Sequence, residues 1–590
     1  HTGLPTGDDT ELALIMLRAL VYVGPSARHV TPWIDPVQSL LRSKIEPARR
    51  LEAGTVLLHY HAQAGEPTQA NSIARLLEPV LQRSRDTTEF QVDALTALSL
   101  NQWLAAEHSM AQQSIEHAME MVEQAAHRRA LHGLFAEAAA TALSMNDLDA
   151  AEDWLDRQAR VLGEMHTDAI IAHHLLANWH ALLRGDLPGA SEHLTIAQRL
   201  QPGNAAWFIE AWFQQAQAQT LLQSGNPEMA AAPLAELLRL ARHHRNPRMQ
   251  YTGLLLTAQK ALEENHIDEA RTALAEAFQA GRRQGLINFH GWQPRPMARL
   301  CALALEHGIE TEYARELVRL RNLPAMDDAR DLDAWPWPVK IFSFGRLSIL
   351  REGQPVSFSR RAQSRPLDML TALLANGGRG VSEETLSSIL WPDADGDAAH
   401  QAFDTNLFRL RRLLGHERAL LLSDAKLSLN PAVCWVDAWA CERLFGRLDT
   451  LLRAAPAGEN ETDIARLGAR LLALYRGPFL GRDHADPWAV AGRERLHGRY
   501  LRQLNALIRF WEDRGQWEHA AAACERLIDV QPENEEHYQR LMIAYRELDR
   551  LADAAAVYQR CRDTLLANLG RPPSPATTLI FQDLGTFSNL

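Results

Sequence analysis

Cysteine is scarce in this sequence of 590 residues, and its placement excludes two kinds of structural site. The five cysteines are odd in number, far apart and never arranged as a Cys-x-x-Cys pair; they are Cys301, Cys434, Cys441, Cys524 and Cys561. A disulfide framework or a zinc site needs paired or closely spaced cysteines. We therefore expect these residues to be small buried hydrophobic side chains.

Lysine is rarer still, and none of the four lysines follows a glycine. A Walker A loop holds nucleotide phosphates with a Gly-Lys pair, so these residues contain no such loop. The histidines are no stronger as candidates: His166, His173 and His180 recur every seven residues, and His59 lies near His61, but no carboxylate or cysteine has metal-binding spacing to them. We expect no catalytic residue, no metal and no cofactor, and the chain is not predicted to be an enzyme.

Long apolar runs are also missing. No uninterrupted stretch of about 18 apolar residues occurs, and the first residues have neither the basic start nor the apolar core of a secretion signal. These absences predict a cytoplasmic protein without a membrane partner. The chain starts at His1 without an initiator methionine, which suggests a piece of a longer chain, and its length predicts several domains.

An internal repeat of 40 residues is the main feature that is present. Turn-like segments followed by a helix-starting alanine occur at Ala70, Ala150, Ala190, Ala230 and Ala270, with a weaker member near Ala111. Each unit predicts two amphipathic helices whose apolar faces are buried only when neighbouring units stack into a solenoid. The pattern resembles the tetratricopeptide-like repeats of large bacterial regulators over residues 10–322. Four aromatic residues in this region are expected either to belong to the solenoid core or to line a ligand pocket: Trp207, Phe208, Trp212 and Phe213.

The amino-acid composition changes at residues 323–338. This acidic, proline-containing stretch cannot continue a helix and predicts a flexible linker. Beyond it, the pattern predicts strands over 339–345 and 346–351, helices over about 361–375, 382–390 and 397–414, and a strand pair over 419–423 and 426–430. This is the order of a winged helix, an α+β DNA-binding fold, which we place at 339–436. Although the whole chain has a net charge of −12, this segment has 12 Lys and Arg against 10 Asp and Glu.

The third predicted helix of this segment has two different faces. At 100° per residue, Phe403, Leu407, Leu410 and Leu414 fall on one narrow face, which we expect to be buried. The opposite face carries Gln401, Thr405, Phe408, Arg409 and Arg412. Arginine and glutamine can pair with base edges in a major groove, and threonine or phenylalanine can touch a thymine methyl group. Viewed alone, the same stripe is also typical of an arginine-rich solvated face.

Further basic residues flank this helix. Arg360, Arg361 and Arg365, at the start of the first predicted helix, are candidates for phosphate contacts that position the domain without reading sequence. Lys426 is the one basic residue near the tip of the terminal hairpin, the wing. Contact between the wing and DNA stays an open alternative.

Residues 437–582 are predicted to be helical, with the tetratricopeptide signals at Ala520 and Ala554, 34 residues apart, and Pro532 in the loop between them. Several motifs carry a family resemblance. The runs Ser382–Pro392 and Asp404–Leu414 resemble the winged helix of response regulators and of the SARP activators, and the motifs at 474–480, 488, 494–496, 532–535 and 569–574 are similar to the bacterial transcriptional activator domain that follows it. The resemblance implies DNA contacts by Thr405, Asn406, Arg409 and Arg412. The wing, Ser423–Asn430, departs from the family pattern.

The sequence thus predicts a mainly α protein with three parts: a helical-repeat arm, a winged helix and a second tetratricopeptide-like domain. We expect a sequence-specific transcriptional regulator, an activator by resemblance, that binds double-stranded DNA as a homodimer and contacts RNA polymerase. The arm is expected to sense a small molecule or a partner protein. Two alternatives stay open: a protein-binding scaffold, or the non-catalytic C-terminal part of a larger nucleotide-switched ATPase.

Overall fold

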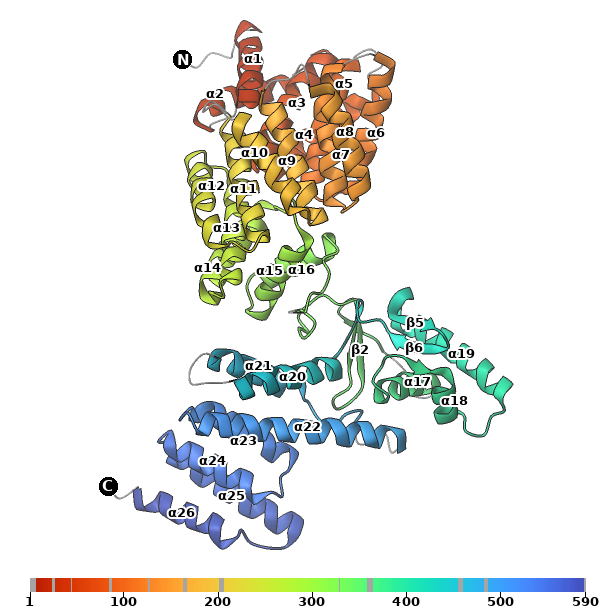
Figure 1. Ribbon diagram of the computed structural model, residues 1–590, viewed down its shortest axis with the longest axis vertical. Helices are drawn as coiled ribbons and strands as arrows, with labels where there is room; N and C mark the ends of the chain where they lie inside the picture. Colours follow the sequence, from red (N-terminus) through yellow and green to blue (C-terminus); the bar gives the residue numbers. More distant parts are fainter. Residues whose placement is uncertain are drawn as a thin grey trace. The chain divides into compact units, whose positions relative to one another are not determined.

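The chain divides into two compact units, His1–Asp328 and Ala329–Leu590 (Figure 1). The computed structural model describes every residue except 1–6, 24–26, 44, 84–87, 126–127, 163–166, 201–205, 328, 358–363, 455–459, 482–486 and 588–590. All five cysteines are buried, as predicted. Among the described residues, no helix is long and apolar enough to cross a membrane.

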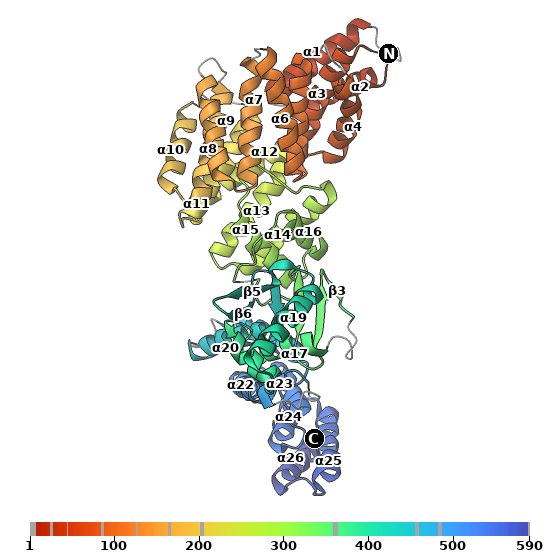
Figure 2. The same ribbon diagram turned by 90° about the vertical axis from the view of Figure 1, so that its right-hand side faces the viewer.

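The first unit is built from helices that pair with their neighbours in sequence order (Figures 1 and 2). They are α1 (Gly7–Val23), α2 (Ala27–Arg42), α3 (Pro47–Ala64), α4 (Pro67–Arg83), α5 (Thr88–Leu104), α6 (His108–Ala125), α7 (Arg128–Ser144), α8 (Leu148–Val161), α9 (Thr167–Arg184), α10 (Leu187–Leu200), α11 (Trp207–Gln223), α12 (Ala231–His243), α13 (Pro247–Glu263), α14 (Ile267–Gln284), α15 (Pro294–Glu306) and α16 (Thr311–Leu320). The predicted helical repeat is confirmed.

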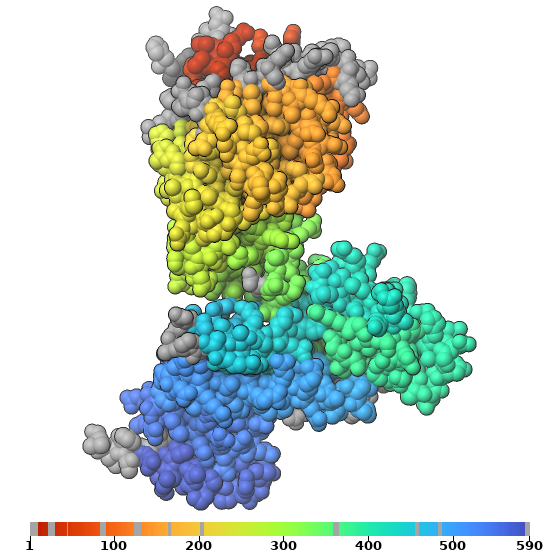
Figure 3. Space-filling view, in the orientation of Figure 1, coloured from red at the N-terminus to blue at the C-terminus, as the bar shows by residue number. Residues whose placement is uncertain are grey.

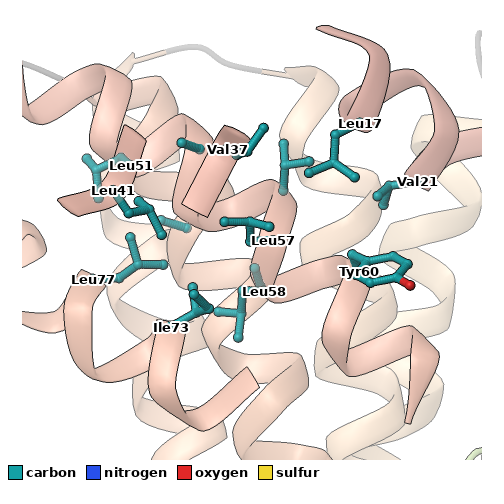
Figure 4. Packing of buried hydrophobic residues seen from close by; sticks show 14 of the residues in the cluster. Leu17, Val21, Val37, Leu41, Leu51, Leu57, Leu58, Tyr60, Ile73 and Leu77 are labelled. Atoms are coloured by element: carbon teal, nitrogen blue, oxygen red, sulfur yellow. The ribbon is translucent and has the colours of Figure 1, made fainter. Parts of the chain in front are cut away.

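The repeat alanines mark the point where the two helices of a pair cross. Ala70, Ala111, Ala190, Ala230 and Ala270 are fully buried, but the third member of the series is Ala151 and not Ala150. Ala151 donates its backbone N–H to Asp147, four residues earlier, as Ala190 does to Asp186. The small side chain lets the helices approach closely, so the apolar faces of the helices are buried in a series of clusters along the repeat. Figure 4 shows this packing for the first four helices, where Leu17, Val37, Leu57 and Leu77 come together.

A segment between α14 and α15 lies against the inner side of the repeats, a feature that the sequence analysis missed. Its backbone accepts hydrogen bonds from side chains of two earlier helices: Trp179 Nε1 donates to Trp292 O at 2.9 Å and Gln219 Nε2 to Gly291 O at 2.6 Å. In the other direction, Asn288 Nδ2 donates to Trp103 O at 2.9 Å. Residues 288–292 therefore join three repeats that are far apart in the sequence.

The second unit begins with two small sheets and three helices. The strands are β1 (Val339–Phe342), β2 (Ser348–Arg351), β3 (Gln354–Pro355), β4 (Val381–Ser382), β5 (Leu420–Ser423), β6 (Lys426–Leu429) and β7 (Cys434–Val436), in the orders β3-β2-β1-β7 and β4-β6-β5. The helices are α17 (Ser364–Ala375), α18 (Glu383–Leu390) and α19 (Gly396–Leu414). The fold class is as predicted, but β3, β4 and β7 were not anticipated.

The segment expected to be a flexible linker is packed at its C-terminal end. Trp335 and Trp337 are buried, and the buried carboxylate of Asp331 forms ion pairs with Arg443 at 2.6 Å and Arg447 at 3.1 Å. Burial of two large aromatic side chains and a doubly paired carboxylate outweighs the local preference of an acidic, proline-containing stretch for an open coil. Residues 329–338 thus belong structurally to the second unit.

Seven helices complete the second unit. They are α20 (Asp437–Ala454), α21 (Glu461–Leu474), α22 (Pro487–Glu512), α23 (Trp517–Val530), α24 (Glu535–Glu547), α25 (Leu551–Leu569) and α26 (Pro575–Phe587). Ala520 and Ala554 are fully buried at their predicted helix crossings. Tyr538 in α24 donates its hydroxyl to Pro532 O at 2.9 Å, which fixes the loop before this helix.

Candidate nucleic-acid interface

Helix α19 is held by defined caps and one apolar face. The Asp395 carboxylate accepts the backbone N–H of Ala398 at 2.9 Å, and Gly415 ends the helix in the left-handed conformation that glycine adopts readily. The predicted buried residues are all inside: Phe403, Leu407, Leu410 and Leu414. Packing of this face fixes the rotation of the helix, so the opposite face is turned to solvent. The helix lies at the surface of the second unit, turquoise in Figure 3.

The opposite face presents the predicted set of side chains. Gln401, Thr405, Phe408, Arg409 and Arg412 are all exposed. The Phe408 side chain is 67% exposed, which is unusual for a large aromatic residue. Within the part of the chain that the structure describes, the guanidinium groups of Arg409 and Arg412 have no hydrogen bond or ion pair. Both groups are therefore able to bind an anionic ligand such as a phosphate.

Asn406 does not belong to this surface. Its side chain is only 6% exposed, and its Nδ2 donates to Ala402 O at 2.7 Å. The reason is geometric, because Asn406 is about 60° around the helix from Phe403, at the edge of the apolar face. The family resemblance implied a DNA contact by Asn406. The buried position of its side chain contradicts that expectation.

The remaining predicted contacts differ in how they are placed. Arg360 and Arg361 lie outside the described residues. Arg365 is exposed in the first turn of α17, and its Nη1 is 3.4 Å from Leu390 O, so its guanidinium lies beside the end of α18. Lys426 is exposed directly after the turn of the β5–β6 hairpin.

One cation near this stripe was missed. Arg411 is exposed beside Arg412 and likewise has no partner among the described residues. The run Arg409-Leu-Arg-Arg412 was the available signal, but a helical wheel places Arg411 away from the centre of the stripe. At the other end of α19, His400 pairs with Glu383 and lies 3.7 Å from Asp404. The hydrogen bond to Glu383 raises the pKa of His400 above its usual value. The three arginines of α19 thus lie in its C-terminal half, whereas the raised pKa of His400 favours a positive charge near its N-terminal end.

The winged helix is joined to the following helices by a buried carboxylate. Asp437, the first residue of α20, is 1% exposed and accepts the backbone N–H groups of Ser343, Phe344 and Ala438 at 2.7–2.9 Å. It also accepts the Ser343 hydroxyl at 2.5 Å. Ser343 and Phe344 directly follow β1, so α20 starts from a fixed position on the sheet.

The motif at residues 474–480 forms a second junction between the same parts. Leu480 N donates to Ser343 O at 2.7 Å, and Gly345 N donates to Pro478 O at 3.0 Å. Tyr475 stacks on Tyr500 of α22 with the ring centroids 3.8 Å apart. These residues therefore join the winged helix to α22.

Comparison with known proteins agrees with this architecture. A family model described as "Bacterial transcriptional activator domain" matches residues 436–584. The transcriptional regulatory protein EmbR of Mycobacterium tuberculosis is 28% identical over 242 residues, which are 39% of this chain and 59% of EmbR. The transcriptional regulatory protein MoaR1 of Mycobacterium bovis is 23% identical over 244 residues, 39% of this chain and 76% of MoaR1. The chain thus spans less than two thirds of the length of EmbR.

Among solved structures, that of Mycobacterium tuberculosis EmbR in complex with a low affinity phosphopeptide aligns at 24% identity over 42% of this chain and 66% of that one, with a TM-score of 0.30. A Rap protein complexed with competence and sporulation factor aligns at 11% identity over 55% of this chain and 90% of that one, with a TM-score of 0.41. The family match and the two regulators confirm the resemblance seen in the sequence. The C-terminal part of this chain has the organisation of the SARP-type transcriptional activators, and a region of tetratricopeptide-like helical repeats precedes it.

Proposed function

We propose that the chain is a sequence-specific DNA-binding transcriptional regulator whose α19 enters the major groove. The observation that carries the proposal is the exposed face of α19, where the unpaired guanidinium groups of Arg409 and Arg412 flank Phe408 and Thr405. A helix with one face buried and the other cationic is the usual reader of a major groove in helix-turn-helix folds. Arg365 and Lys426 supply phosphate contacts that position the domain, as Arg360 and Arg361 also would.

The test is DNA binding by the full chain and by its variants. Arg409→Ala and Arg412→Ala should each weaken binding to a native promoter by about 1–3 kcal/mol if either arginine pairs with a base. Arg239→Ala is the matched control, because Arg239 is an exposed arginine on α12, outside residues 339–582, that already pairs with Glu236. Fluorescence anisotropy with labelled duplex measures all three. Unchanged DNA affinity in both α19 variants would show that this helix does not bind in the major groove.

Residues 437–582 are assigned to activation and assembly. The match to a bacterial transcriptional activator domain supports contact with RNA polymerase and pairing of two copies on DNA. One winged helix reads few base pairs, so discrimination among many competing sites calls for two half-sites. Footprinting combined with the mass of the complex tests the pairing: protection of a single half-site by a monomer would contradict it.

The first unit is assigned a sensing role, because its repeat surface is far larger than DNA binding requires. We expect that deletion of residues 1–328 changes DNA affinity or promoter output. Equal output from the truncated and full chains under all growth conditions would leave the arm without regulatory function. A chain that shows no saturable binding to duplex DNA would instead be a protein-binding scaffold.

A further inference from the structure

An arginine is buried inside the first unit, at a place where distant repeats meet. Arg248 is the second residue of α13, and its side chain is 3% exposed. Its guanidinium lies 5.2 Å from the ring of Phe208 in α11. A Cβ atom added at Gly65, which follows α3, would lie 3.0 Å from the Cβ of Arg248. The neighbouring Asn246 donates to Gln63 O at 2.8 Å, which joins the start of α13 to the end of α3.

The guanidinium of Arg248 has no hydrogen-bond acceptor among the described residues. Both Nη1 and Nη2 are buried without a partner. Glu137 of α7 interacts with this charge but forms no hydrogen bond to it, and its own Oε2 is buried and unpartnered. A buried cation without an acceptor is strongly unfavourable, because the water that solvated it has been removed and nothing replaces it. Such a group is retained where something else supplies the acceptor.

The charges around Arg248 leave one positive charge uncompensated. Burial lowers the pKa of Arg248 to about 10, so the guanidinium stays protonated at neutral pH. Burial raises the pKa of Glu137 to about 8, and the charge of Arg248 limits this rise, so the carboxyl is mostly neutral at pH 7. Burial holds the pKa of His290 well below its usual value, so this ring is neutral as well. A ligand with a single negative charge would balance the site.

The apolar surroundings of Arg248 further restrict the chemical class of the ligand. The rings of Phe208 and Trp212 lie with their centroids 6.5 Å apart, and Trp212 packs on His290 at 4.4 Å. Phe208 contributes an aromatic face next to the guanidinium. A planar guanidinium pairs best with a planar two-oxygen acceptor, and a phosphate would bring a second negative charge with no second cation to meet it. Carboxylate chemistry therefore fits these residues better than phosphate chemistry.

We propose that Arg248 binds the carboxylate of an organic acid with an apolar body on the inner side of the repeat arm, next to Phe208 and Glu137. This inference rests on the proposed sensing role of the arm, to which it adds the site and the chemical class of the effector. Glu137 in its neutral form donates a hydrogen bond to the same carboxylate. The aromatic rings cover the apolar part of the ligand.

The test is calorimetric titration of the full chain with benzoate as the probe, in a chloride-free buffer. Wild type should bind benzoate saturably with one site and a Kd of about 1 mM or tighter. Neutral benzamide and inorganic phosphate should each bind at least about tenfold more weakly. Benzamide has no charge to pair with Arg248, and phosphate brings a second negative charge that no cation of the site compensates. The Arg248→Met variant should lose benzoate binding. The matched control is Arg242→Met, which changes an exposed arginine in the last turn of α12.

Removal of an uncompensated buried charge should leave the free arm at least as stable as before, so we expect the Arg248→Met variant to fold. If its circular dichroism shows otherwise, Arg248→Lys keeps the charge without the planar fork and should weaken benzoate binding about tenfold. Benzoate binding that survives both substitutions, phosphate binding as tight as benzoate binding, or no saturable binding by wild type would each overturn the proposal. The readout involves no DNA, so such a failure leaves the assignment of α19 intact.

Discussion

Replacement of Asp437 by asparagine tests the junction between the winged helix and the helices that follow. Burial raises the pKa of Asp437 to about 6, so at pH 7.5 the carboxyl is largely ionised and accepts from all its donors. Its Oδ2 accepts the N–H groups of Ser343 and Phe344, and its Oδ1 accepts the Ser343 hydroxyl and the N–H of Ala438. An asparagine must turn its NH₂ group toward one of these pairs. At least one buried N–H then loses its acceptor: that of Phe344 if the NH₂ group takes the place of Oδ2, or that of Ala438 if it takes the place of Oδ1 and donates to the Ser343 hydroxyl.

An unsatisfied buried donor costs about 1–3 kcal/mol, so the variant should lose about 1–3 kcal/mol locally. Hydrogen exchange followed by mass spectrometry measures this in the full chain, because a loss of 2 kcal/mol speeds exchange about 30-fold. The effect should appear in peptides that cover Ser343 and Phe344. Asp333→Asn is the matched control, since Asp333 is exposed and lies close in the sequence to Ser343 and Phe344. Unchanged exchange of these amides in a folded Asp437→Asn variant would refute the reasoning.

Three further outcomes are expected. Ala425→Gly should stabilise the second unit by up to about 1 kcal/mol in thermal unfolding, because Ala425 has a φ of 54° in the wing turn, a conformation that glycine adopts without strain. Asp331→Ala should speed hydrogen exchange of residues 329–338, because Arg443 and Arg447 lose their shared partner, whereas a segment held by Trp335 alone would be unaffected. Phe408→Ala should leave thermal stability within about 0.5 kcal/mol, because the ring is 67% exposed, yet weaken DNA binding in an anisotropy titration.

The helical elements followed from the sequence wherever local periodicity determined them. The repeat was readable from alanine spacing, and the apolar stripe of α19 correctly identified Phe403 and Leu410 as buried. Ala150 was assigned in place of Ala151 because the two alanines are adjacent, and only the helix crossing distinguishes them. Asn406 was misplaced because a family motif does not state how far around the helix a residue lies.

Non-local contacts could not be predicted in the same way. The strand β7 pairs in parallel with β1. Because nearly 100 residues separate Val339 from Cys434, no turn motif in the sequence predicts this pairing. The acidic stretch around Asp331 looked open because its partners, Arg443 and Arg447, come more than 100 residues later. Likewise, the buried position of Arg248 depends on α3 and α11, which no local pattern relates to α13.

The network around Asp437 has a practical consequence for dissecting this protein. A fragment that ends at Val436, where composition suggests a boundary, would remove the acceptor for the backbone N–H groups of Ser343 and Phe344 and expose the edge that Leu480 covers. A fragment made for the DNA-binding tests therefore has to run from Ala329 through α22 to keep β1 and the residues that hydrogen-bond to its end. The same holds for chimaeras: an exchange of the winged helix has to include the loop at 475–481, so that both are transferred as a single cassette.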